Sequence, residues 1–220
     1  MLKSTSPGEY LFPNAKVHDG ARFIFVHVTK TAGVAIKRSL QSCGIDIKTF
    51  HQTVCDRIQS NGPDVFSAYP GYAVVRDPLD RIVSAYYYGK ERNKDGWPEH
   101  DHLALQSCKD FTAFCHAVED NRTMDSLLIC KPQTAWVCDS EGNIPVELWP
   151  YDRVQGFWKH LCRKHDIRPL GRPLRRVNTS RHPHFLDCHS KETIAITYRV
   201  YEQDAILYEE LMKVKEGRAP

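Results

Sequence analysis

The stretch FIFVHVTKTAGVAIK, residues 23–37, combines a strand, a turn and the start of a helix. Residues 21–28 are mainly β-branched and aromatic, which predicts a strand buried on both faces. Gly33 lies in the turn that follows, and Ile36 and Leu40 predict a helix directly after it. Such a turn directs backbone N–H groups and the positive end of the helix toward one point. Lys30 adds a full charge and Gly33 permits close approach, so the stretch predicts a site for a phosphate-like anion.

This turn differs from the Walker loop of nucleotide-binding proteins. In GxxxxGK[ST] the glycines precede the lysine, whereas Lys30 and Thr31 come before Gly33 here. The order weakens a magnesium-nucleotide interpretation without excluding it. An ordinary strand-to-helix turn with a surface lysine is the structural alternative.

The same alternation of strand and helix continues along the chain. Residues 45–50 and 71–78 predict two further strands, each followed by a helix, the second of which begins at Pro78. This order predicts an α/β fold with a P-loop-like central parallel sheet flanked by helices. Farther on, residues 135–139 and 145–150 are expected to be short strands, and residues 110–118, 157–165 and 191–213 to be helices.

Length and composition favour one globular domain. The chain has 220 residues and a formal net charge of +3, too small a surplus to indicate nucleic-acid binding. We expect an N-terminal arm over 1–20, a domain over 21–212 and a tail over 213–220. No apolar run is long enough to span a bilayer, and the N-terminus has no apolar signal region. A cytoplasmic or soluble protein is expected, or a Golgi lumenal one if this chain is trimmed from a longer protein; the oligomeric state stays open.

Cysteine and histidine patterns do not predict a metal site. None of the eight cysteines forms a CxxC pair, which excludes the usual zinc-ribbon and thioredoxin interpretations. Reduced and mostly buried thiols are expected, or one disulfide in an oxidising compartment. The histidine groups lack partners at zinc-binding spacing; they are His100 with His102, His160 with Cys162 and His165, and His182 with His184 and His189.

A second motif, VVRDPLDRIVSAYYY, occupies residues 74–88. Arg76 falls at the carboxyl end of a predicted strand, the edge where parallel sheets bind ligands. A guanidinium there and the hydroxyl of Ser84, two turns into the next helix, can together bind a phosphate. The alternative for Arg76 is an ion pair at the strand end, and Asp80 and Arg81 are expected on a solvated helix face.

These two motifs, VHVTKTAGVAI and VVRDPLDRIVSAY, resemble the sulfotransferase superfamily, and most closely its carbohydrate branch, which includes uronosyl 2-O-sulfotransferases. The resemblance extends to PQTAWVCDSEGNIPVELWPYDRV, to VNTS and to TYRVYEQDAILY, and so covers about residues 21–212. It implies an enzyme that transfers the sulfuryl group of 3′-phosphoadenosine 5′-phosphosulfate to a hydroxyl, on a glycan or small sugar.

The resemblance also assigns residues. The family's loop for the 5′-phosphosulfate is matched by Lys30, Thr31, Ala32, Gly33, Val34 and Ala35. The family residues that bind the 3′-phosphate are matched by Arg76 and Ser84, and more weakly by Arg181. This chain departs from the family pattern at four residues. Thr29 stands in place of the usual proline, Ala32 in place of a glycine, and Val34 and Ala35 in place of the usual hydroxyl residues. Backbone N–H groups and Lys30 are then left to hold the phosphosulfate.

Sulfuryl transfer needs in-line attack on sulfur while charge grows on the leaving oxygen, and Lys30 is suited to that oxygen. His51 follows a predicted strand and is expected to act as the base for the acceptor hydroxyl, with a capping or core histidine as the alternative. His27, within the first strand, is expected to be structural. Two other functions remain: a P-loop nucleotide kinase or phosphotransferase, and a non-catalytic nucleotide- or glycan-binding module of the same fold.

Overall fold

A computed structural model of the chain describes residues 23–45, 51–91, 105–120, 127–168, 173–174 and 183–214. The described residues form two compact units whose segments alternate along the chain. The first unit comprises Met1–Val28, Ala32–Val75 and Ala135–Val177, and the second Thr29–Thr31, Arg76–Thr134 and Asn178–Pro220. Each is described by itself below. One domain over 21–212 stays a prediction.

The first unit is built on a parallel sheet. Its strands in the described residues are β1 (Ile24–Val26), β2 (Gly71–Val75) and β3 (Val146–Pro150), in the order β1-β2-β3. Ile24 lies opposite Gly71, and Gly71 opposite Val146. The α/β class with parallel strands is therefore confirmed. The strand expected over 45–50 lies outside the described residues, except for Ile45.

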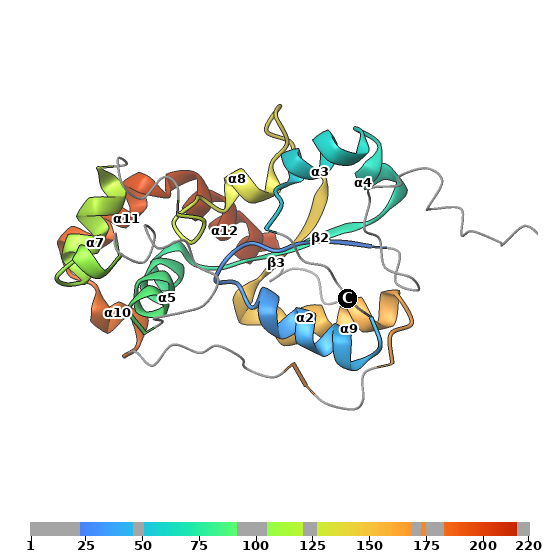
Figure 1. Cartoon of the computed structure of the whole chain (residues 1–220), viewed down its shortest axis with the longest axis horizontal. Coiled ribbons are helices and arrows are strands. Elements are labelled where there is room, and N and C mark those ends of the chain that lie inside the picture. Colours follow the sequence, from blue (N-terminus) through green and yellow to red (C-terminus); the bar gives the residue numbers. More distant parts are fainter. Residues whose placement is uncertain are drawn as a thin grey trace, which may run out of the picture. The chain divides into compact units, whose positions relative to one another are not determined.

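Helices cover both faces of this sheet. The helices α2 (Gly33–Ser42) and α9 (Val154–Lys164) lie on one face, and α3 (Val54–Asn61) and α4 (Val65–Ala68) on the other (Figure 1). A 3₁₀ turn, η1 (Tyr151–Arg153), links β3 to α9. The core under α2 and α9 is aromatic and aliphatic and contains Phe23, Phe25, Ala35, Ile36, Leu40, Tyr72, Val74, Phe157, Trp158 and Leu161. Burial of this apolar surface holds the unit together.

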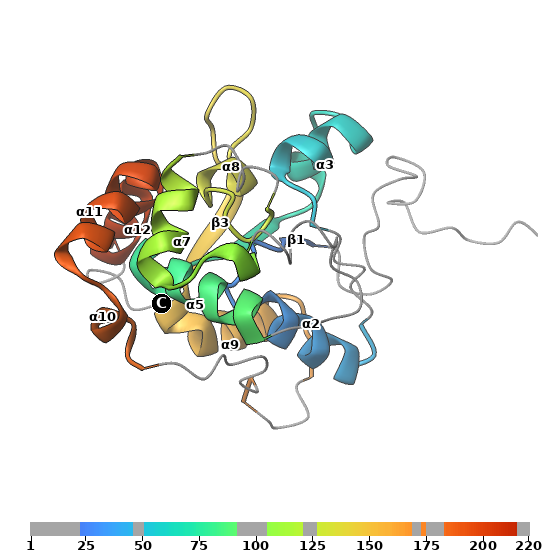
Figure 2. The same ribbon diagram turned by 60° about the vertical axis from the view of Figure 1, so that its left-hand side comes forward.

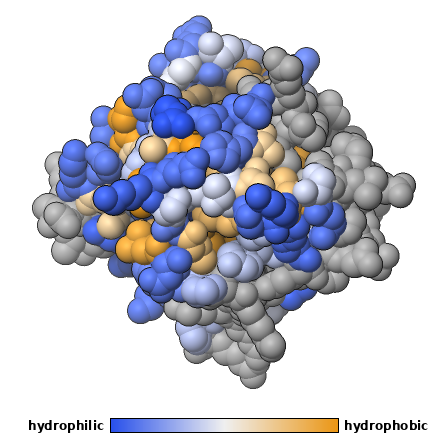
Figure 3. Space-filling view, turned by 90° about the vertical axis from the view of Figure 1, so that its left-hand side faces the viewer, coloured by the Kyte–Doolittle hydropathy of each residue, from blue (hydrophilic) through white to orange (hydrophobic). Residues whose placement is uncertain are grey.

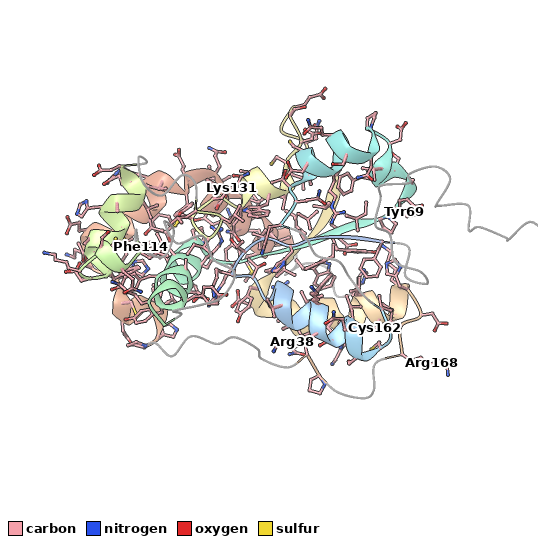
Figure 4. The ribbon with its side chains drawn as sticks, viewed as in Figure 1. Arg38, Tyr69, Phe114, Lys131, Cys162 and Arg168 are labelled. Atoms are coloured by element: carbon pink, nitrogen blue, oxygen red, sulfur yellow. The ribbon has the colours of Figure 1, made fainter. Side chains whose placement is uncertain are left out.

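The second unit is helical. Its described helices include α5 (Pro78–Glu91), α7 (Phe111–Glu119), α10 (Phe185–Cys188), α11 (Lys191–Val200) and α12 (Glu202–Val214). The views agree that α7 and α11 lie side by side (Figures 1 and 2). Phe114, labelled in Figure 4, is fully buried in a core that also contains Tyr86, Leu105, Phe111, Cys115, Ile196 and Tyr201. This core is separate from that of the first unit.

Two sequence predictions about these elements are wrong. Residues 135–139 were expected to be a strand, yet α8 (Thr134–Val137) is helical. The carboxylate of Asp204 accepts hydrogen bonds from the Thr134 N–H (2.8 Å) and hydroxyl (3.0 Å), and this negative group favours a helix start.

The helix expected over 191–213 is interrupted at Tyr201, between α11 and α12. Tyr201 is buried, and its hydroxyl donates to the Cys130 carbonyl at 2.7 Å. The interruption coincides with this distant contact, which helical periodicity does not reveal.

The surface is mixed, and none of the described helices is both long and apolar enough to cross a bilayer. Figure 3 shows hydrophobic side chains interrupted by hydrophilic ones on the face toward the viewer. The eight cysteines are free thiols, of which Cys55 is exposed. Cys108, Cys115, Cys130 and Cys162 are buried.

Gly33, at the start of α2, packs directly against the imidazole of His27. A Cβ on residue 33 would overlap the His27 ring atoms Cδ2, Nε2 and Cγ. His27 is itself buried at 6% exposure, so its ring has little room to move. Gly33 therefore has a packing role against His27, which its place in the turn does not indicate.

We predict that Gly33→Ala lowers the free energy of unfolding by about 1–3 kcal/mol, the usual cost of overpacking. Urea denaturation measures it, and the penalty should shrink in a His27→Ala background because the obstructing ring is gone. An equal penalty in both backgrounds would contradict the contact.

Candidate functional site

Arg76, directly after β2, is held at both its backbone and its side chain. Its N–H donates to Oε1 of Gln133 at 2.9 Å, and its carbonyl accepts from Nε2 of the same amide at 2.8 Å. Its Nε and Nη2 donate to the two carboxylate oxygens of Asp80, each at 2.6 Å. The strand-end ion pair that the sequence left open for Arg76 is therefore present. It is a bidentate pair, which fixes the plane of the guanidinium.

The Lys30 segment meets this arginine within the second unit. Arg76 Nη1 donates to the Lys30 carbonyl at 3.1 Å. The Lys30 ammonium lies 3.6 Å from the centroid of the Tyr88 ring, a cation–π distance. Lys30 and Arg76, which the sequence placed near each other, are thus in contact, and anion binding by them stays a prediction.

One face of α5 runs along this region. Asp80, Ser84 and Tyr88 follow at intervals of four residues, so they lie on the same side of the helix. Asp80 contacts Arg76 and Tyr88 contacts Lys30, which places Ser84 between the two contacts. Ser84 is itself buried, and its role as a phosphate ligand stays a prediction.

Arg81 contradicts the sequence prediction of a solvated face. It is only 2% exposed, and its guanidinium donates to oxygens of Thr29 and Lys131. Those acceptors come from segments about 50 residues away, and only folding brings them to the helix.

In the first unit, α2 begins with an uncapped turn. Its N-cap residue is Ala32, in the left-handed region at φ 70°, and no described side chain caps the helix there. Ala32 has no side-chain oxygen, so it cannot cap the first N–H groups of α2 as a serine or aspartate would. Ala35, where the family pattern has a hydroxyl, is buried in the apolar core, which explains an apolar residue at that position.

His51 lies near two other rings of the first unit. Its ring centroid is 4.8 Å from that of His27 and 6.0 Å from that of Trp136. Burial, together with the nearby charge of Lys37, lowers the pKa of His51, while a hydrogen bond with the His27 backbone opposes the shift. His51 is therefore neutral near pH 7 and able to accept a proton.

His27 is buried, whereas His51 keeps an exposed surface. Burial first, and then the charges of His51 and Lys37, lowers the pKa of His27 to about 3. Its Nδ1 is buried with no hydrogen-bond partner among the described residues. A ring that stays neutral and packs against Gly33 agrees with the structural role expected from the sequence.

The predicted site residues therefore fall into separate groups. Lys30, Thr31, Arg76 and Ser84 belong to the second unit, whereas residues 32–35 and His51 belong to the first. Arg181 lies outside the described residues, as do His100, His102 and His182. Roles for these residues stay predictions.

Sequence reasoning missed Tyr88, Gln133 and Asp204. Tyr88 could have been found, because it continues the four-residue spacing of Asp80 and Ser84 on one helix face. Gln133 was noted only as part of a motif, and nothing in the sequence pairs it with the backbone of Arg76 or with Asp204.

Together these features define a mixed α/β protein with a basic residue after one parallel strand and an uncapped helix after another. Residues 13–209 match the model of a protein family described as the sulfotransferase family. The chain belongs to this family, whose members transfer a sulfuryl group to a hydroxyl acceptor. No curated protein and no solved structure matches the chain.

The buried neutral His27 should make stability depend on pH. The unfolded chain binds a proton at His27 below about pH 6.5, but the folded chain does so only near pH 3. As far as His27 is concerned, the free energy of unfolding is therefore at its full value above pH 6.5 and falls as the pH is lowered toward 3. At pH 5 the loss from this group is about 2 kcal/mol.

Urea denaturation at pH 7 and pH 5 measures the effect, with His27→Gln as the comparison because glutamine does not titrate. Other histidines titrate in both proteins, so the difference between the two pH dependences isolates His27. Identical pH dependences would show that His27 is not the group responsible.

Proposed function

We propose that this sulfotransferase uses 3′-phosphoadenosine 5′-phosphosulfate as donor and transfers its sulfuryl group to a hydroxyl on a carbohydrate. The observation that carries the proposal is the contact of Arg76 Nη1 with the Lys30 carbonyl at 3.1 Å. It joins the two basic motifs within the second unit of a chain that belongs to the sulfotransferase family.

The donor has two anionic ends, and the chain offers two sets of residues for them. Lys30, Thr31, Ala32, Gly33, Val34 and Ala35 would hold the 5′-phosphosulfate, through the lysine ammonium and backbone N–H groups. Arg76 and Ser84 would hold the 3′-phosphate, with Arg181 as a further candidate. This division makes the loop P-loop-like in function, although its sequence is not a Walker loop.

The residues present fit such an anion. The first turn of α2 has no side-chain cap among the described residues, and an anion is what a helix N-terminus binds in place of one. Asp80 fixes the Arg76 guanidinium in one plane, which suits recognition of a phosphate.

When bound, the donor supplies a sulfuryl group whose departure leaves negative charge on the bridging oxygen. Lys30 provides a cation for that charge, and backbone N–H groups of the turn provide preorganised donors. His51, neutral because its pKa is lowered by burial, is proposed to take the proton of the acceptor hydroxyl.

Donor recognition is tested by calorimetry with 3′-phosphoadenosine 5′-phosphate, the product of the donor, against ATP with Mg²⁺. We expect tight binding of the bisphosphate, and a loss of at least tenfold in Lys30→Ala and in Arg76→Ala, since each removes a charge-assisted contact.

Two exposed residues provide matched controls. Lys159→Ala removes a lysine on α9, and Arg199→Ala removes an arginine that pairs with Glu119 at 2.6 Å. Both should leave affinity unchanged. A preference for ATP with Mg²⁺ would indicate a nucleotide phosphotransferase instead. Tight binding of the bisphosphate without sulfuryl transfer to any acceptor would indicate a non-catalytic module.

The base is tested by turnover with a panel of glycans and small sugars, monitored by release of 3′-phosphoadenosine 5′-phosphate. His51→Ala should lower kcat by about 10²-fold or more while leaving affinity for the bisphosphate unchanged. In the wild type, activity should persist below pH 6.5, because the pKa of His51 is lowered by burial.

His116→Ala, at an exposed histidine on α7, serves as the control and should retain full turnover. Unchanged turnover in His51→Ala would remove this residue from the base role. Failure of every sugar acceptor, with transfer to a non-sugar alcohol, would overturn the carbohydrate assignment.

A further inference from the structure

Thr29, the residue before Lys30, is buried and bonded through both its hydroxyl and its carbonyl. The hydroxyl donates to the Leu128 carbonyl at 3.0 Å and accepts from Arg81 Nη2 at 3.1 Å. The Thr29 carbonyl accepts from Arg81 Nε at 3.1 Å. One residue of the turn is thus held at three points within the second unit.

Arg81 is the centre of this arrangement. Besides Thr29, its Nη2 donates to the Lys131 carbonyl at 2.7 Å; Lys131 is labelled in Figure 4. The guanidinium lies 6.0 Å from the ring centroid of buried Tyr201. A buried arginine is costly unless its donors have partners, and here two backbone carbonyls and one hydroxyl accept from its Nε and Nη2.

Two arginines therefore hold two successive carbonyls. Arg81 binds the carbonyl of Thr29, and Arg76 binds that of Lys30. Between them Lys30 adopts a left-handed backbone conformation, with φ 66°. A non-glycine residue there costs about 1 kcal/mol or more, and it persists where the surroundings fix the chain.

We propose that Thr29 and Arg81 are positioning residues that set the conformation of Lys30 for the 5′-phosphosulfate of the donor. The proposal rests on the proposed function of Lys30 and extends it to two residues that touch neither donor nor acceptor. It also accounts for the threonine that stands where the family pattern has proline, because proline has no hydroxyl for Arg81 and Leu128.

A purely structural role makes a different prediction. If Thr29 only stabilised the second unit, its loss would weaken every ligand alike. If it acts through Lys30, its loss weakens the end of the ligand that Lys30 binds. Comparing 3′-phosphoadenosine 5′-phosphate with adenosine 3′-monophosphate separates the two, because the second lacks the 5′ group.

The test is calorimetry of both nucleotides with Thr29→Val, which keeps the shape and removes the hydroxyl. We expect about five- to tenfold weaker binding of the bisphosphate and less than twofold change for the monophosphate. Thr29→Ser, which restores the hydroxyl, should recover most of the affinity. Thr29→Ala is measured in parallel, because it also removes the hydroxyl and serves if the Thr29→Val variant does not fold.

The matched control is Thr197→Val on α11. This also removes one buried hydroxyl, which donates to the Thr193 carbonyl at 2.7 Å, and should leave the ratio of the two affinities unchanged. In a Lys30→Ala background, Thr29→Val should have no additional effect, since coupled residues are not additive.

The outcomes distinguish the two proposals. If the wild type fails to bind the bisphosphate, the proposed donor is wrong. If the wild type binds it but Thr29→Val and Thr29→Ala weaken both nucleotides equally or neither, Thr29 and Arg81 do not position Lys30, while the proposed function stands.

Discussion

The side-chain amide of Gln133 is the interaction on which the arrangement of the second unit depends. It pairs with both the N–H and the carbonyl of Arg76, as a neighbouring strand would. Gln133 is almost completely buried, and its own N–H donates to the Asp204 carboxylate at 2.7 Å. A buried backbone group without a partner is costly, so one glutamine fixes where Arg76 leaves its strand. The same carboxylate also accepts from the N–H and hydroxyl of Thr134 within this unit.

Three positively charged side chains of this unit lie at or beside the segment Thr29–Lys30. The chain carries a net charge of only +3, yet the guanidinium groups of Arg76 and Arg81 both bind the Thr29–Lys30 segment, to which Lys30 adds its own ammonium. Arg76 has a carboxylate partner, Asp80, whereas the bonds of Arg81 go to neutral oxygens. Positive side chains can therefore gather at one segment of a nearly neutral protein, because local placement rather than total charge sets the potential there.

Elements defined by local patterns were predictable from the sequence. Residues 71–78 indicated a strand and Pro78 a helix start; β2 begins at Gly71 but ends at Val75, three residues earlier than expected, and α5 begins at Pro78. The end of β2 also placed Arg76 correctly. Local patterns failed where a partner distant in the sequence is involved. The Asp204 carboxylate accepts a hydrogen bond at Thr134, where α8 begins, and the carbonyls of Thr29 and Lys131 accept from the buried Arg81. The close packing of Gly33 on His27 was hidden for the same reason.

The departures of this chain from the family pattern have a common physical consequence. Ala35 lies in an apolar core and Ala32 cannot cap a helix, so Thr31 is left as the residue of the proposed phosphosulfate loop that has a side-chain hydroxyl. Recognition must then come mainly from backbone N–H groups and from Lys30. Backbone donors cannot change direction by rotating a side chain, and their usefulness depends on the accuracy of the dihedral angles that aim them. Left-handed conformations at Lys30 and Ala32 are therefore to be expected in such a loop, together with a residue such as Thr29 that ties its first peptide to buried neighbours.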